Sequence, residues 1–234
     1  TATRASTNAL ELPRPQPWHG PTPKTISVGD LEVPAEALMY LCGLFVGDGF
    51  VSNQVKRVPS KSGLTFEERV CAARNPETGR FFSTGRIGSL ETVEQRSFRV
   101  FFDIPCSDPA RPRLRTALDA VEALFTEHSG KAGEHVYVGG ERWATFFTQF
   151  GKGAANKRIP RWILDLDATL LEHVFRGLID SDGHAQVTPV YTTVSEGLVG
   201  DLCELAFKLG KLPKVDYSYS ESTIEGRPVS GWAY

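Results

Sequence analysis

Apolar residues recur with helical spacing in two separate segments, and both segments lead into the same dipeptide. The first runs from Ala35 to Val46 and the second from Ala168 to Ile179. Each is followed closely by Asp-Gly, at Asp48-Gly49 and at Asp182-Gly183. Glycine just after a helix is a common stop signal, so the pattern predicts two helices that each carry a carboxylate at the C-terminal end.

Small residues four apart predict how these helices meet. Gly43 and Gly47 share one face of the first helix, and Gly177 and Ser181 share one face of the second. A missing side chain lets another backbone approach closely, so we expect the two helices to pack on these faces. Parallel packing would bring Asp48 and Asp182 to the same level.

Two carboxylates at helix C-termini are electrostatically unfavourable unless a cation compensates them, because that end of a helix carries partial negative charge. A shared divalent metal would supply the compensation. Asp-Gly after an apolar helix is also an ordinary turn, and a single copy would favour that structural interpretation. Two copies with matching small residues favour the metal site. A calcium loop is excluded, since Pro189 stands where the loop needs its Glu.

The rest of the chain alternates strand and helix patterns in two similar series. Five prolines between residues 13 and 23 predict an irregular lead over residues 1–24. The first series predicts strands at 50–58, 64–73, 97–102 and 135–138, with helices at 113–127 and 141–150. The second predicts strands at 185–193 and 214–219 and a helix at 196–209, and it ends before an equivalent of the first closing helix.

The composition of the chain bears on whether it binds nucleic acid, holds zinc or disulfides, or enters a membrane. The chain has 234 residues and a net charge of -2, which argues mildly against a nucleic-acid binder, but basic residues outnumber acidic ones between residues 51 and 116. Four cysteines without paired spacing and five scattered histidines indicate neither a zinc site nor a disulfide framework. The longest apolar run, residues 38–46, is too short to span a bilayer, and no targeting signal is present, so we expect a cytoplasmic protein without membrane contact.

The two Asp-Gly segments resemble the paired motifs of the LAGLIDADG homing endonucleases, and within them the type embedded in inteins. The first motif departs from the family by carrying Val46 where an acid is common, whereas Asp48 and Asp182 match the family's second acidic position. Residues 156–160, Asn-Lys-Arg-Ile-Pro, resemble the family's basic block. The resemblance spans about residues 26–234.

The resemblance implies an α+β fold with pseudo-two-fold symmetry, in which two antiparallel sheets form a DNA-binding saddle and the motif helices lie at the interface. Residues 1–30 would be a Pro-rich lead or linker, 31–165 the first half-domain, and 166–234 a second, abbreviated half-domain. No splicing residues are found: the chain starts with Thr1, no Thr precedes a His by three residues, and it ends at Tyr234. We therefore expect the endonuclease region only, cut from something longer or abbreviated.

The implied function is site-specific cleavage of double-stranded DNA by hydrolysis with Mg2+, for which Mn2+ substitutes, leaving short 3′ overhangs. Asp48, Asp182 and Lys157 would be catalytic, and the metal site would be formed by Asp48, Asp182, Gly47 and Ser181. The long target would be asymmetric, and the protein a monomer whose other partners would be host protein segments. DNA contacts are expected from the strand residues Gln54, Lys56, Arg69, Arg74, Arg86, Arg99, Gln186, Thr188, Tyr191 and Tyr217. The alternative is a catalytically inactive relative that binds DNA as a regulator or RNA as a maturase.

Overall fold

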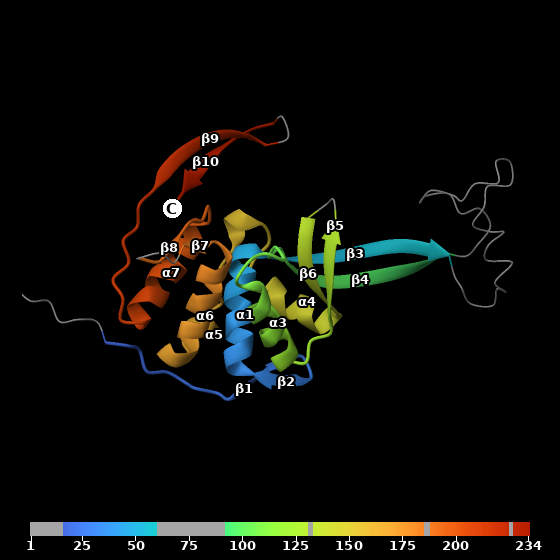
Figure 1. The fold of residues 1–234 in the computed structure, drawn as a ribbon, viewed down its shortest axis with the longest axis horizontal. Coiled ribbons are helices and arrows are strands. Elements are labelled where there is room, and N and C mark those ends of the chain that lie inside the picture. The colour runs from blue at the N-terminus through green and yellow to red at the C-terminus, as the bar shows by residue number, and fades with distance from the viewer. Residues whose placement is uncertain (1–15, 60–91, 131–132, 185–187, 225–226) are drawn as a thin grey trace, which may run out of the picture.

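The computed structural model describes residues 16–59, 92–130, 133–184, 188–224 and 227–234 (Figure 1). The first part of the chain contains β1 (Thr25–Val28), β2 (Leu31–Pro34), α1 (Ala35–Asp48), β3 (Gly49–Pro59), β4 (Thr92–Phe102), α3 (Arg111–Ala120), β5 (Phe125–Gly130), β6 (Gly133–Gly139) and α4 (Glu141–Thr148). The second contains the 3-10 turn η1 (Ala154–Asn156), α5 (Arg161–Leu164), α6 (Ala168–Ser181), β7 (Gly183–His184), β8 (Val190–Tyr191), α7 (Glu196–Lys208), β9 (Ser218–Ile224) and β10 (Arg227–Ala233).

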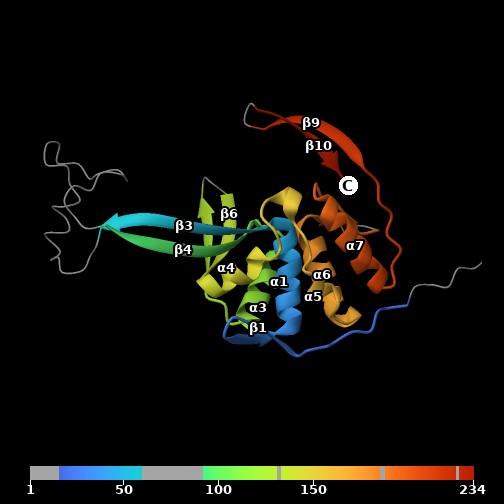
Figure 2. The ribbon, with the colours of Figure 1, turned by 180° about the vertical axis from the view of Figure 1, so that it is seen from behind.

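Helix α1 is the centre of the molecule, and α6 lies beside it in both views (Figures 1 and 2). Every residue of α1 from Leu38 to Val46 is buried, as expected for a helix that is apolar on all sides. Helix α6 is amphipathic and buries its small and apolar side, including Val174, Gly177 and Leu178. It begins where the Asp167 carboxylate accepts a hydrogen bond from the Thr169 amide at 3.0 Å.

A four-stranded antiparallel sheet, in the order β3-β4-β6-β5, lies on the other side of α1. Its inner face buries Val100, Phe102, Val136 and Val138 in the core. Helix α4 covers this face, and the ring of Phe147 on α4 lies 4.5 Å from the ring of Phe45 on α1. The residues that alternate with these along the strands point to the opposite face of the sheet, which we call the open face.

The second part of the chain has smaller sheets. Strands β7 and β8 pair antiparallel, and so do β9 and β10, which form a separate ribbon above α7 (Figure 1). The α+β class with antiparallel sheets and paired motif helices is therefore confirmed. The two parts differ in that the described strands of the second form two ribbons and those around the first motif form one larger sheet and a hairpin.

Several sequence expectations need correction. The predicted helix 113–127 begins two residues earlier and ends at Ala120, because Glu122 takes a left-handed backbone angle, φ 52°, and residues 125–130 form strand β5 instead. The predicted strand 214–219 starts only at Ser218. Of the strand 185–193, only Val190 and Tyr191 are in a described strand, and the expected strand 64–73 lies outside the described residues.

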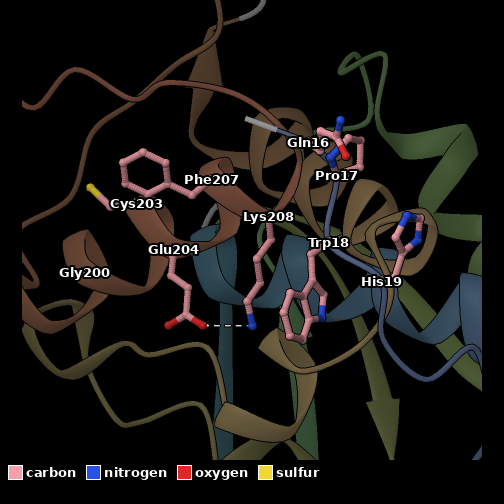
Figure 3. Close-up of a pocket in the computed structure, with 9 residues that line it drawn as sticks. All are labelled: Gln16, Pro17, Trp18, His19, Gly200, Cys203, Glu204, Phe207 and Lys208. Atoms are coloured by element: carbon pink, nitrogen blue, oxygen red, sulfur yellow. Dashed lines mark ion pairs between the residues drawn. The ribbon is translucent and has the colours of Figure 1, made fainter. Parts of the chain in front are cut away.

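Residues 16–24 are irregular until β1 begins, as predicted, but they lie against the second part of the chain. The Trp18 amide donates to the Lys208 carbonyl at 2.8 Å, and the Ala168 amide donates to the Trp18 carbonyl at 3.2 Å. A cavity of about 720 Å³ lies between these residues and α7, where the Lys208 ammonium pairs with Glu204 at 2.9 Å and lies over the Trp18 ring (Figure 3). None of the described helices is long and apolar enough to cross a membrane.

Candidate active site

Glycines bring the two motif helices into backbone contact. A Cβ atom on Gly43 would lie 2.9 Å from the Cα of Gly177, and a Cβ atom on Gly177 would lie 2.9 Å from the Cα of Gly43. One turn later, a Cβ atom on Gly47 would lie 2.6 Å from the Cβ of Ser181 and 3.3 Å from the amide nitrogen of Asp182. Because both contacts advance by four residues in the same direction, the helices pack in parallel, as the spacing of small residues predicts.

Parallel packing places the two aspartates together. Asp48 is the last residue of α1, and Asp182 is the residue that ends α6. Burial, and then the charges of Asp182, Asp103 and Asp108, raise the pKa of Asp48 to about 7. Burial also raises the pKa of Asp182, against the favourable charge of Lys157. Two neighbouring carboxylates with raised pKa values form a site that a cation would stabilise.

Lys157 is a buried ammonium at the end of α1, with 7% of its surface exposed. Its Nζ donates hydrogen bonds to the carbonyl oxygens of Phe45 and Gly49, both at 2.6 Å, and lies 3.9 Å from the centre of the Phe45 ring. It thereby compensates the negative end of the helix. Burial lowers the pKa of Lys157 to about 8, while the charges of Asp182 and Asp48 act in the opposite direction.

The segment around Lys157 is held by α7. Ser195 accepts a hydrogen bond from the Leu198 amide at the start of that helix and donates its hydroxyl to the Lys157 carbonyl at 2.8 Å. Asp201, which is buried, accepts hydrogen bonds from Nε and Nη2 of Arg158, at 2.7 and 2.9 Å, and from the Ile159 amide at 2.9 Å. Sequence reasoning missed these two residues; only the position of Ser195 before a predicted helix was a signal.

Asp103 is a further acid that sequence reasoning missed. Its amide donates to the Asp48 carbonyl at 3.0 Å, so the end of β4 is joined to the end of α1. Burial raises the pKa of Asp103, while His135 acts in the opposite direction. Within the described ranges, however, no group of three or more His, Cys, Asp or Glu side chains is arranged to hold a metal ion.

Tyr191 lies beside the carboxylates. Strand pairing sets it opposite Gly183, the residue after Asp182, and burial followed by the charges of Asp182 and Asp48 raises the pKa of its phenol. Ser181 donates its hydroxyl to the Leu178 carbonyl at 2.9 Å, within its own helix.

Asp180, the other acid of the second motif, belongs to a separate network. Arg113 on α3 donates two hydrogen bonds to its carboxylate, both at 2.7 Å, and the Tyr40 hydroxyl of α1 donates a third at 2.8 Å. The counterpart of Asp180 in the first motif is Val46, which is buried. The second motif thus uses this position to join α1, α3 and α6.

The expected DNA-contacting residues are only partly described. Gln54 and Arg99 are exposed and, by alternation, share the open face of the β3-β4-β6-β5 sheet. Thr188 and Tyr217 are exposed next to β8 and β9, which belong to other sheets. Lys56 lies in β3, but its side chain is outside the described part. Arg69, Arg74, Arg86 and Gln186 lie outside the described residues.

Comparisons with known proteins give structural similarity only. No protein-family model matches the sequence, and no curated protein matches it. Among solved structures, the chain is similar to the homing endonuclease I-DmoI in complex with DNA and Mn, at 12% identity and a TM-score of 0.45, over 85% of this chain and 89% of that one. For I-DmoI in complex with DNA and Ca the values are 11% and 0.47, over 85% and 81%. At this level the likeness concerns the fold, and an assignment of function rests on the residues of the site.

Proposed function

We propose that this chain is a metal-dependent DNA endonuclease that hydrolyses phosphodiesters at the junction of α1 and α6. The observation that carries the proposal is the pair of aspartates, Asp48 and Asp182, at the C-terminal ends of two parallel helices packed through Gly43 and Gly177. Together with the resemblance of both segments to LAGLIDADG motifs, this arrangement supports a nuclease over a purely structural protein.

The donor set fits a magnesium ion. Asp48 and Asp182 offer hard carboxylate oxygens, and because burial raises the pKa of both, a cation bound there would favour their ionised form. Magnesium keeps several water ligands and takes substrate phosphate oxygens, so two protein carboxylates suffice. When bound, a divalent ion would lower the pKa of water and neutralise charge that develops on the phosphate. Mn2+ would substitute for it, and the motif positions Gly47 and Ser181 would flank the ligands.

Lys157 contributes positive charge to the proposed site, and Ser195 and Asp201 hold Lys157 in position. Lys157 is held by two carbonyl oxygens close to both carboxylates, where it offsets their mutual repulsion and provides positive charge near the phosphate. Because the pKa of Lys157 is about 8, this side chain could also release or take up a proton near neutral pH. Ser195 and Asp201 fix the backbone that carries it.

DNA would lie across the open face of the sheet, with Gln54 and Arg99 directed to the groove. The resemblance to LAGLIDADG endonucleases extends this proposal to an asymmetric target, a monomeric state and an intein context. It also implies DNA contacts from Lys56, Arg69, Arg74, Arg86, Gln186, Thr188, Tyr191 and Tyr217. The division into half-domains at residues 31–165 and 166–234 belongs to the same proposal.

The test is cleavage of a plasmid library with randomised inserts, with and without magnesium, followed by sequencing of the cut ends. We expect recurrent magnesium-dependent cuts at one long asymmetric site. Asp48→Asn and Asp182→Asn should each abolish double-strand cleavage while DNA binding persists. The matched control is Glu36→Gln, which removes an exposed carboxylate from the other end of α1. Binding without cleavage by the unaltered chain would contradict the enzyme and favour the inactive regulator or maturase.

A further inference from the structure

The open face of the β3-β4-β6-β5 sheet presents a guanidinium that rests on an aromatic ring rather than on an acid. Arg99 on β4 is exposed, and its guanidinium carbon lies 4.8 Å from the centre of the Tyr137 ring on β6. Among the described residues no carboxylate pairs with Arg99, and none accepts a hydrogen bond from it. Arg113 and Arg158, by contrast, each donate two hydrogen bonds to a carboxylate. The contact that holds Arg99 therefore leaves its N–H donors available to a ligand.

The Tyr137 ring is itself supported from one side. Phe101, its partner across the strands, lies 5.5 Å from Tyr137 between ring centres, and Phe101 stacks on Phe50 at 4.6 Å. These rings cover one another, so they form a support for Arg99 and not a surface for a ligand. A guanidinium placed over an aromatic ring is attracted to it, and it loses less freedom when it binds a further group.

The strand register places only small residues directly opposite Arg99. They are Ser52 on β3 and Gly139 on β6. A Cβ atom on Gly139 would have no neighbouring heavy atom within 4 Å, so the space on that side is open. A molecule that lies across the open face can therefore reach the edge of the guanidinium.

The free donors indicate the chemistry of the ligand. One edge of a guanidinium carries two parallel N–H donors, which match two acceptors on one rigid group. In the major groove of paired DNA, guanine presents two acceptors, N7 and O6, whereas each of the other bases presents at most one. A phosphate also presents acceptor pairs, but it carries no sequence information. Because β4 is a central strand of the sheet, Arg99 is placed to meet a base edge in the groove.

We propose that Arg99, positioned by Tyr137, reads a guanine in the major groove of the target. Arg99 precedes Phe102 by three residues, and Phe102 pairs with Gly49 directly after α1. Strand residues and base pairs both rise by about 3.4 Å, so we place this guanine about three base pairs from the cleaved phosphate. The inference rests on the proposed nuclease function and adds to it one base of the target and a positioning residue.

The experiment selects duplexes from a randomised pool by binding to the protein in EDTA and sequences the bound fraction. We expect a guanine at one position of the selected site, about three base pairs from the phosphate that the unaltered protein cleaves once magnesium is added. Arg99→Gln should reduce the preference for guanine at that position by about tenfold or more, and preferences at the other positions should remain.

Two variants of Tyr137 keep the test decisive if Arg99→Gln fails to fold, and they separate positioning from a structural role. Tyr137→Phe keeps the ring and should retain the guanine preference. Tyr137→Leu removes the ring and should weaken that preference by about threefold, at the same position only. The matched control is Arg142→Gln on α4, which removes an exposed guanidinium that pairs with Asp30 at 3.1 Å and should leave the selected site unchanged.

Equal weakening of all sequences by Arg99→Gln would show that Arg99 binds a phosphate, and the inference would be wrong while the nuclease proposal stayed intact. Selection of the same bases by Arg99→Gln and by the unaltered protein would overturn it in the same way. If the unaltered protein bound no duplex at all, both the inference and the proposed function would be contradicted.

Discussion

Replacing Asp48 by Asn should stabilise the metal-free protein near pH 8, although it removes a residue assigned to the active site. Burial and neighbouring carboxylates raise the pKa of Asp48 from 3.8 to about 7. A carboxyl with a higher pKa in the folded state favours folding when protonated, so its stabilisation is complete below about pH 4 and is lost as the pH rises through about 7. The neutral amide does not have this dependence.

The magnitude follows from the shift. A change of one pKa unit corresponds to about 1.4 kcal/mol, which gives an upper limit of about 4 kcal/mol for the ionised carboxylate. Asp48 is partly exposed, so water screens much of this energy, and Lys157 loses one of its two compensating charges in the variant. We therefore expect a gain of about 1–2 kcal/mol in the free energy of unfolding at about pH 8.

Urea denaturation followed by circular dichroism, at about pH 4 and about pH 8 in EDTA, measures the difference. The variant should exceed the unaltered protein only at the higher pH. Added magnesium should stabilise the unaltered protein and leave Asp48→Asn unchanged, since only the former binds the ion in its folded state. If the variant were less stable than the unaltered protein at about pH 8 in EDTA, this prediction would be wrong, because the ionised carboxylate would then be favourable.

Three further predictions concern the groups around the site. Gly43→Ala should destabilise the protein by about 2 kcal/mol or more in the same urea assay, because the new methyl group meets the α6 backbone. The control Gly200→Ala on α7, where the added methyl group has open space, should stabilise the protein by up to about 1 kcal/mol. Equal effects of the two substitutions would contradict the close packing of α1 and α6. Lys157→Met should cost about 1–3 kcal/mol by removing the buried ammonium that donates to the Phe45 and Gly49 carbonyls, and it should also reduce cleavage. An unchanged urea midpoint would show that these hydrogen bonds contribute nothing. Tyr40→Phe should cost about 1 kcal/mol by removing one donor to Asp180, and cleavage measured on the same preparation should persist, since the Asp180 network is assigned to helix packing; lost cleavage would place Asp180 in the active site instead.

The local pattern of the sequence predicted the central features of the fold. The apolar spacing and the Asp-Gly dipeptides gave both motif helices to within two residues, and the small residues at Gly43 and Gly177 gave their contact. These features were predictable because periodicity and glycine act within one or two helical turns.

Long-range contacts were not predictable in the same way. The carbonyl oxygens that bind Lys157 are 112 and 108 residues away from it in the chain, and Asp201 is 43 residues from Arg158. No local pattern encodes such pairs. The helix predicted over residues 113–127 was too long at its C-terminal end for another reason. Apolar residues continue with helical spacing to Phe125, but the backbone turns at Glu122 and leaves Leu124 90% exposed.

The most direct test of the shared metal site is anomalous diffraction from crystals of the protein with duplex DNA and Mn2+. We expect an anomalous peak within bonding distance, about 2.0–2.2 Å, of carboxylate oxygens from both Asp48 and Asp182. A peak bound elsewhere, with neither aspartate among its ligands, would contradict it.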